Sequence, residues 1–205
     1  MNTAVSTNGG RSAAVAGVAA MSQKSVSTIV LPGVDIDVDI DSFRAAMHEL
    51  AAGVAIVTVG KDRDITGFTA TSILSLSAYP PRLLVCVDQG SASWLALHRH
   101  PHFGVNILRD QESTLANRFA GRDGLTGAAR YAGARWATML TGTPILENAL
   151  AALDCEVEEM IPRYDRSIVI GRVLAASICP GPFPLVYWQG NYHPLDRAAR
   201  SAGMR

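Results

Sequence analysis

Cysteine is scarce in this 205-residue chain, which contains three cysteines at widely separated positions. They are Cys86, Cys155 and Cys179. An odd number without close spacing argues against a disulfide framework and against a cysteine-based zinc site. Cys86 and Cys155 stand inside apolar strand patterns, so we expect them to pack in the core of a protein that is kept reduced in the cytoplasm.

An excess of one charge sign is also missing, because 18 lysines and arginines balance 18 aspartates and glutamates. The chain therefore lacks an overall basic field that would attract nucleic acid or an anionic membrane surface. No apolar run approaches the roughly 18 residues that a membrane-spanning helix requires, although 48% of the residues are hydrophobic. Low charge with high apolarity predicts instead that some apolar surface is buried between subunits.

Several motifs of nucleotide and hydrolase chemistry are absent as well. The chain has no Gly-x-Gly-x-x-Gly and no Walker-type loop, so neither a Rossmann dinucleotide site nor a nucleoside-triphosphate site is expected. It has no Gly-x-Ser-x-Gly elbow and no evident Ser/His/Asp set. His98, His100 and His102 match no familiar zinc spacing. We therefore expect no metal site and interpret these histidines as the basic end of a helix.

The stretch from residue 67 to residue 94 carries the most distinctive pattern in the chain. In its first half, apolar side chains alternate with hydroxyl side chains, as in a strand with one apolar and one polar face. Ser72 and Ile73 interrupt the alternation and predict a bulge or bend, and Pro80 and Pro81 should end the strand. The apolar positions are Phe68, Ala70, Leu74 and Leu76, and the hydroxyl positions are Thr69, Thr71, Ser75 and Ser77.

The second half of this stretch predicts a buried strand over residues 83–87, followed by a helix that begins near Ser91 and Ser93. Serines at a helix start satisfy free backbone N–H groups, and this end of a helix attracts anions. A row of hydroxyls beside such a helix suits a flat, phosphorylated ligand. A threonine-rich edge strand followed by an ordinary N-cap is the alternative interpretation.

Further alternating segments predict a mainly β protein with short helices. Asp154, Glu156 and Glu158 alternate with apolar residues. We interpret these carboxylates as the solvated face of a strand rather than as a general acid–base pair. Six or more strands with few helices favour a closed β-barrel architecture. Strands are expected at residues 54–59, 103–107, 153–158, 167–176, 185–188 and 191–193, and helices at residues 41–52 and 115–121.

The chain is expected to contain one folded domain with an irregular segment at each end. Residues 1–38 are rich in small residues without a lasting period, so we interpret them as a disordered tail rather than a signal peptide. The folded domain should span residues 39–196, and residues 197–205 should form a loose end. The glycine-rich loop over residues 121–134 either covers a site or merely connects two elements.

Taken together and in order, several segments resemble the flavin reductase-like family. The matching segments are residues 67–72, the Ser-Leu-Ser-x-x-Pro-Pro turn, residues 83–88 with Ser91 and Ser93, and residues 103–108, 115–120, 134–136 and 192–195. The resemblance implies a homodimeric split β-barrel that uses NADH or NADPH to reduce FMN or FAD. Such a protein supplies the reduced flavin to a separate monooxygenase component. A flavin- or haem-binding split-barrel carrier or sensor without reductase turnover is the alternative.

The resemblance also implies which residues bind the flavin. One group would line the isoalloxazine ring and the ribityl chain, a second would lie beside it, and a third would hold the phosphate at the helix start. The first group is Thr69, Ala70, Thr71 and Ser72, the second is Cys86, Val87 and Asp88, and the third is Ser91 and Ser93.

The nicotinamide side departs from the pattern of the family. Most members have a Gly-Asp-His motif here, and its His is associated with the nicotinamide donor. This chain has Tyr164, Asp165 and Arg166 instead. A guanidinium is permanently charged and matches phosphate oxygens, so Arg166 is expected either to bind the phosphates of NADH or NADPH or to be a solvated turn residue. His193 is a further candidate for contact with the rings, with a surface hairpin histidine as the alternative.

Overall fold

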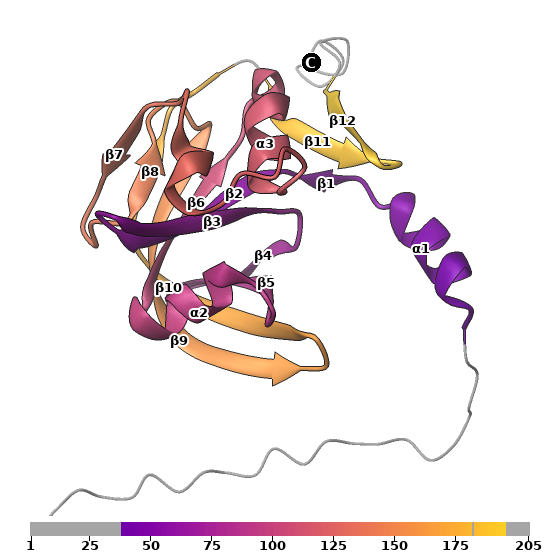
Figure 1. Ribbon diagram of the computed structural model, residues 1–205, viewed down its shortest axis with the longest axis horizontal. Helices are drawn as coiled ribbons and strands as arrows, with labels where there is room; N and C mark the ends of the chain where they lie inside the picture. The colour runs from indigo at the N-terminus through magenta and orange to yellow at the C-terminus, as the bar shows by residue number, and fades with distance from the viewer. Residues whose placement is uncertain (1–37, 182, 196–205) are drawn as a thin grey trace, which may run out of the picture. The chain divides into compact units, whose positions relative to one another are not determined.

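The computed structural model describes residues 38–181 and 183–195. Two expected segments lie outside these ranges. They are the tail expected over residues 1–38, apart from Val38, and the loose end expected over residues 197–205. Within them the chain forms twelve strands, three α-helices and two short 3-10 helices, so the mainly β composition is as predicted (Figure 1). No helix in the described ranges is both long and apolar enough to cross a membrane.

A seven-stranded antiparallel sheet forms the body of the fold, with strand order β3-β2-β6-β9-β10-β5-β4 (Figure 1). Its two edge strands follow each other in the chain with only Thr71 and Ser72 between them. The sheet therefore curls until its two edges approach each other at this corner. The strands are β2 Ala55–Lys61, β3 Asp64–Ala70, β4 Ile73–Ala78, β5 Pro81–Asp88, β6 His102–Ile107, β9 Ala151–Arg163 and β10 Arg166–Ile178.

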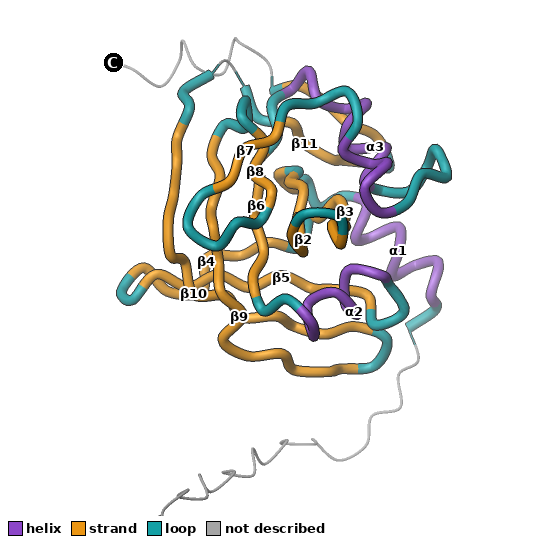
Figure 2. The backbone as a smooth tube through the Cα atoms, turned by 60° about the vertical axis from the view of Figure 1, so that its left-hand side comes forward, coloured by secondary structure: helices purple, strands orange, loops and turns teal. Residues whose placement is uncertain are grey.

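Smaller elements surround this sheet (Figure 2). Three strands form a second sheet in the order β1-β11-β12, and a short hairpin pairs β7 with β8. These strands are β1 Ala52–Gly53, β11 Leu185–Trp188, β12 Asn191–Pro194, β7 Trp136–Thr138 and β8 Pro144–Leu146. The helices are α1 Ile40–His48, α2 Ala92–Arg99 and α3 Ser113–Phe119, with 3-10 helices η1 Asp110–Glu112 and η2 Gly127–Tyr131.

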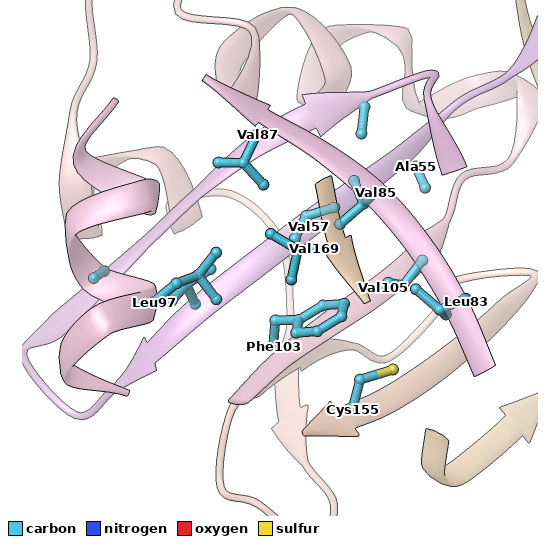
Figure 3. Packing of buried hydrophobic residues seen from close by; sticks show 13 residues of the cluster. Ala55, Val57, Leu83, Val85, Val87, Leu97, Phe103, Val105, Cys155 and Val169 are labelled. Atoms are coloured by element: carbon cyan, nitrogen blue, oxygen red, sulfur yellow. The ribbon is translucent and has the colours of Figure 1, made fainter. Parts of the chain in front are cut away.

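The core consists of two clusters that share strand β2. Successive side chains of a strand point to opposite faces. Val57 and Val59 therefore join the cluster around Phe103 (Figure 3), and Ile56 joins the cluster that contains Leu108. These five side chains are fully buried. Burial on both faces explains why the sequence of β2 is a continuous apolar run rather than an alternating one.

Gly171 is required by the packing of the first cluster. A Cβ atom at this position would lie 2.4 Å from the Cζ atom of Phe103. Phe103 lies on β6 and Gly171 on β10, which are separated in the sheet by β9. Because glycine has no side chain, the phenyl ring of Phe103 can extend across the curled sheet into this space.

The hydroxyl-rich stretch forms two strands rather than one bent strand. β3 ends at Ala70 and β4 begins at Ile73, so the predicted interruption at Ser72 and Ile73 is a corner between the edges of the sheet. The predicted apolar face continues only in part, because Leu74 and Leu76 on β4 are 60% and 48% exposed. The alternation described the backbone correctly but did not show which apolar residues this chain buries.

The first helix lies earlier than the sequence predicted. Asp39 is its N-cap, because the Oδ2 atom of Asp39 accepts a hydrogen bond of 3.1 Å from the backbone N–H of Ser42. α1 ends at His48, and residues Ala52 and Gly53 form a strand that pairs with β11 instead of the last helical turn. Backbone pairing with a distant strand uses these residues, so the helix ends before residue 52, where the sequence predicted its end.

The interpretation of Asp154 as a solvated strand residue is wrong. Its side chain is fully buried, whereas Glu156 is partly exposed and Glu158 is exposed. The carboxylate of Asp154 accepts hydrogen bonds from the backbone N–H of Thr141, at 2.8 Å, and from the Thr141 hydroxyl, at 2.6 Å. The turn before β8 therefore covers this strand, and a buried carboxylate is tolerated because it is hydrogen-bonded.

Candidate active site

A cavity of about 390 Å³ opens where β3, the corner that follows it, β5, β10 and α3 come together. Two phenylalanines provide apolar walls, hydroxyl side chains stand along one side, and two arginines border it. Its volume is within the usual range of small-molecule sites. The lining residues are Phe68, Thr69, Ala70, Thr71, Ser72, Cys86, Asp88, Ser91, Phe119, Ala120, Arg130 and Arg166.

The corner between β3 and β4 positions the hydroxyl side of the cavity. The Thr69 hydroxyl donates a hydrogen bond of 2.6 Å to the carbonyl of Ala116, which joins β3 to α3. Thr71 and Ser72 are exposed at the corner itself. Gly67 allows Phe119 to approach β3 closely, because a Cβ atom at residue 67 would lie 2.8 Å from the Cε1 atom of Phe119. Apolar and hydrogen-bonding groups therefore meet at one end of the cavity.

The start of α2 supplies backbone N–H groups at another side of the cavity. Ser91 is the N-cap, and its Oγ atom accepts a hydrogen bond of 3.1 Å from the backbone N–H of Trp94. The same hydroxyl donates a hydrogen bond of 2.7 Å to the carbonyl of Asp88. The first turn of a helix leaves N–H groups without helical partners, and Ser91 brings this end of α2, which favours an anion, to the cavity.

Arg166 borders the cavity next to Asp88. The two residues are directly opposite each other on β10 and β5. The Nη1 atom of Arg166 lies 3.4 Å from the Oδ2 atom of Asp88, and its Nε atom lies 3.4 Å from the Oδ2 atom of Asp165. The side chain is about half exposed, and both ion pairs are long. Exposed pairs of this kind stabilise the fold little, so the guanidinium can turn toward a phosphate at low cost.

Arg130 borders the cavity from the glycine-rich segment between α3 and β7. Its Nη1 atom donates to the carbonyls of Gly67, at 2.7 Å, and of Phe119, at 3.3 Å. Its Nε atom donates to the carbonyl of Leu125 at 2.8 Å. These hydrogen bonds hold the segment against β3 and α3. They also place a fixed positive charge beside the aromatic wall of the cavity.

Four of the residues expected at the site lie outside the cavity lining. Val87 is buried in the first core cluster (Figure 3). Ser93 is also buried, and its hydroxyl lies 3.5 Å from that of Thr66. Asp165 is exposed in the turn before β10. His193 lies on β12 in the other sheet, where its Nε2 atom is 3.2 Å from the carbonyl of Trp188.

The remaining expected residues are brought together by the fold, and four others join them. Phe68, Phe119, Ala120 and Arg130 also line the cavity but were not expected there. The sequence showed Phe68 as part of the apolar strand face and Phe119 as part of a short helix. Arg130 had only a weak signal, its place in a glycine-rich loop that could cover a site. Among the described residues, no cluster of three or more His, Cys, Asp or Glu side chains is arranged to hold a metal ion.

Comparison with known proteins identifies the family of this chain. The family model described as a flavin reductase like domain matches residues 47–196. The NADH-dependent FMN reductase RutF of Enterobacter sp. strain 638 is 35% identical over 161 residues, which cover 78% of this chain and 97% of that protein.

Two solved structures have a similar fold. BorF, the flavin reductase component of a bacterial two-component tryptophan halogenase, has a TM-score of 0.71 and 34% identity, with coverage of 78% of this chain and 100% of that chain. The NADH:FAD oxidoreductase SgcE6 of Streptomyces globisporus C-1027, solved with NAD and FAD fragments, has a TM-score of 0.70 and 26% identity, with coverage of 78% and 95%. These matches confirm the family and the split-barrel fold that the sequence motifs predict. The chain belongs to the flavin reductase like domain family.

Proposed function

We propose that this protein is a flavin reductase that oxidises NADH and reduces FMN or FAD. The observation that carries the proposal is one cavity that gathers Thr69, Ser91, Arg130 and Arg166 in a chain of this family. Its apolar walls suit a flat aromatic ring, and its cations and helix start suit a phosphate. When bound, the flavin supplies the hydride-accepting chemistry itself.

The residues of the chain contribute binding, orientation and exclusion of water. Phe68 and Phe119 offer apolar contact for a ring system, and the fixed guanidinium of Arg130 holds positive charge beside it. The exposed Arg166 can bind phosphates of the nicotinamide donor from the open side. Holding two planar rings in contact converts an encounter of two molecules into a step within one complex, which accounts for much of the rate increase.

The reduced flavin would then be passed to a separate monooxygenase component. BorF is a component of a two-component system, and the solved structure of PheA2 is also described as a flavin reductase. This part of the proposal rests on the relatives.

The proposal is tested by mixing the purified protein with NADH and free FMN under air and following the absorbance of the nicotinamide. We expect NADH oxidation that depends on both the protein and the added flavin, and the same assay with FAD and with NADPH gives the preference for each. Tight flavin binding without oxidation of either NADH or NADPH would contradict the proposed reductase activity. It would indicate that the protein is a flavin carrier or sensor.

Ser91 should be close to the phosphate of FMN. Replacing Ser91 with Asp keeps a good N-cap but adds a negative charge at the helix start. Two like charges about 4 Å apart repel by several kcal/mol at a protein surface, so we expect at least a roughly tenfold rise in the Kd for FMN. The affinity for riboflavin, which lacks the phosphate, should hardly change. Fluorescence titration measures both constants.

The control for this variant is Ser91→Asn, which caps the helix equally well without a charge. It should leave the affinities for FMN and riboflavin near those of the unmodified protein. Equal weakening of FMN and riboflavin binding by Ser91→Asp would mean that Ser91 serves only as a helix cap.

We also propose that the protein is a homodimer. α1 has an apolar stripe but buries none of its residues in the described structure. Phe43, Met47 and Leu50 are 58%, 46% and 62% exposed, and apolar groups of this kind are usually covered by another subunit.

Light scattering should give twice the 21.7 kDa mass of the chain. The double variant Phe43→Asp/Met47→Asp should shift the mass to one chain, whereas Leu140→Asp, at a position 74% exposed, should not. A single-chain mass for the unmodified protein at micromolar concentration would contradict the dimer.

A further inference from the structure

A second cavity, of about 420 Å³, lies outside the residues assigned to the flavin. It is formed by η1, α3, the segment before β7, and β8 with the residues after it. Leu115 and Leu146 provide apolar surface, and Gln111 and Asn148 provide amide groups. This cavity is similar in size to the flavin cavity, and the proposed reaction does not use it.

Two arginines border this second cavity. The Nε atom of Arg135 lies 3.2 Å from the Oε2 atom of Glu147, and its side chain is 76% exposed. Arg118 extends from α3, where its Nε atom lies 3.4 Å from the Oδ2 atom of Asp123 and its Nη1 atom donates to the carbonyl of Ala132. In each guanidinium at least one terminal nitrogen has no hydrogen-bond partner within the described residues. Two free guanidinium edges beside an apolar surface match a carboxylate that carries an apolar body.

Glu112 is the only acidic side chain in the lining of this cavity. Its Oε2 atom accepts a hydrogen bond of 2.7 Å from the backbone N–H of Arg109, so its charge is directed to η1. Burial raises the pKa of Glu112 above its usual range. The lining of the cavity therefore contains two guanidinium groups and one carboxylate, and the carboxylate is already hydrogen-bonded.

The two cavities share a wall. Neighbouring residues of α3, Arg118 and Phe119, border the second cavity and the flavin cavity respectively. The segment that follows α3 returns to it through two reciprocal hydrogen bonds. Arg118 donates to the carbonyl of Ala132, and Arg130 donates to the carbonyl of Phe119 at 3.3 Å. These hydrogen bonds connect Arg118 in the second cavity with Phe119 and Arg130 in the flavin cavity.

We propose that the second cavity is an effector site for a small carboxylate with an apolar body, and that its occupation strengthens flavin binding. The coupling follows because a carboxylate that bridges Arg118 and Arg135 ties α3 to the segment before β7. The flavin cavity is then already ordered, so flavin binding loses less conformational entropy. This coupling rests on the proposed flavin site, whereas binding of the carboxylate does not.

Benzoate is the probe for a calorimetric titration of the flavin-free protein. We expect saturable binding that is weakened about tenfold or more by Arg135→Gln and by Arg118→Gln, because each removes a charge-assisted hydrogen bond. Arg172→Gln is the matched control, since Arg172 forms a similar partly exposed ion pair with Glu156 far from this cavity. Inorganic sulfate and acetate should bind much more weakly than benzoate, because neither fills the apolar part.

The coupling is measured by titrating FMN with and without saturating benzoate. We expect the Kd for FMN to fall about fivefold or more, and the Kd for benzoate to fall by the same factor when FMN is bound. The effect should be lost in Arg135→Gln, which leaves Arg130 and Phe119 unchanged. Absence of saturable benzoate binding, or binding that Arg135→Gln does not weaken, overturns the site, and an unchanged Kd for FMN overturns the coupling. Failure of FMN to bind at all would instead overturn the proposed function.

Discussion

Replacing Arg166 with Ala is expected to raise the KM for the nicotinamide donor about 10- to 100-fold. Arg166 borders the cavity on its exposed side, where its guanidinium is held only by two long ion pairs to Asp88 and Asp165. Removal of a hydrogen bond to a charged group costs roughly 1.5–3 kcal/mol, and each 1.4 kcal/mol corresponds to about a factor of ten. Loss of a contact made equally in the ground and transition states raises KM and leaves kcat unchanged.

Steady-state kinetics with NADH and NADPH, together with fluorescence titration of FMN, measure this effect. Arg163→Ala is the matched control, because Arg163 faces Arg166 across the β9–β10 turn but does not line the cavity. Arg166→His, which restores the residue typical of the family, should reduce the use of NADPH relative to NADH. If Arg166→Ala weakens FMN binding and leaves KM for both donors unchanged, Arg166 belongs to the flavin side.

Replacing Phe103 with Ala is expected to have the largest effect on stability. Phe103 is fully buried in the first core cluster (Figure 3). A Cβ atom at Gly171 would lie 2.4 Å from the Cζ atom of its ring. Truncation of a buried phenylalanine costs about 3–5 kcal/mol, because apolar contacts are lost and a cavity remains. Urea unfolding at fixed protein concentration measures the free energy of unfolding, and Leu140→Ala, at a position 74% exposed, should change it by less than about 0.5 kcal/mol.

A double-mutant cycle tests the contact itself. Gly171→Ala should cost about 1–3 kcal/mol, since its Cβ atom would overlap the phenyl ring. In the background of Phe103→Ala the added methyl group enters vacated space, so the double variant should lose less stability than the two single variants together. Strict additivity would show that Phe103 and Gly171 do not share this space.

Local features of the sequence determined most of the strands and one side of the cavity. Alternation along a strand is a property of a few neighbouring residues, so it located β3 and β9 and the break near Ser72. Helix capping is equally local, and Ser91 stands where the sequence places it, as the N-cap of α2. The order of several short motifs identified the family, which comparison with known proteins confirms.

The tertiary structure decided what depends on residues far apart in the chain. Asp154 is buried because the turn at Thr141 covers it, and Ser93 is buried beside Thr66, although both residues occupy positions that the local pattern left exposed. Arg130 reaches the cavity only because carbonyl groups of β3 and α3 hold its guanidinium. Side-chain burial and cavity walls arise from packing between elements, and periodicity within one element carries no information about what covers it.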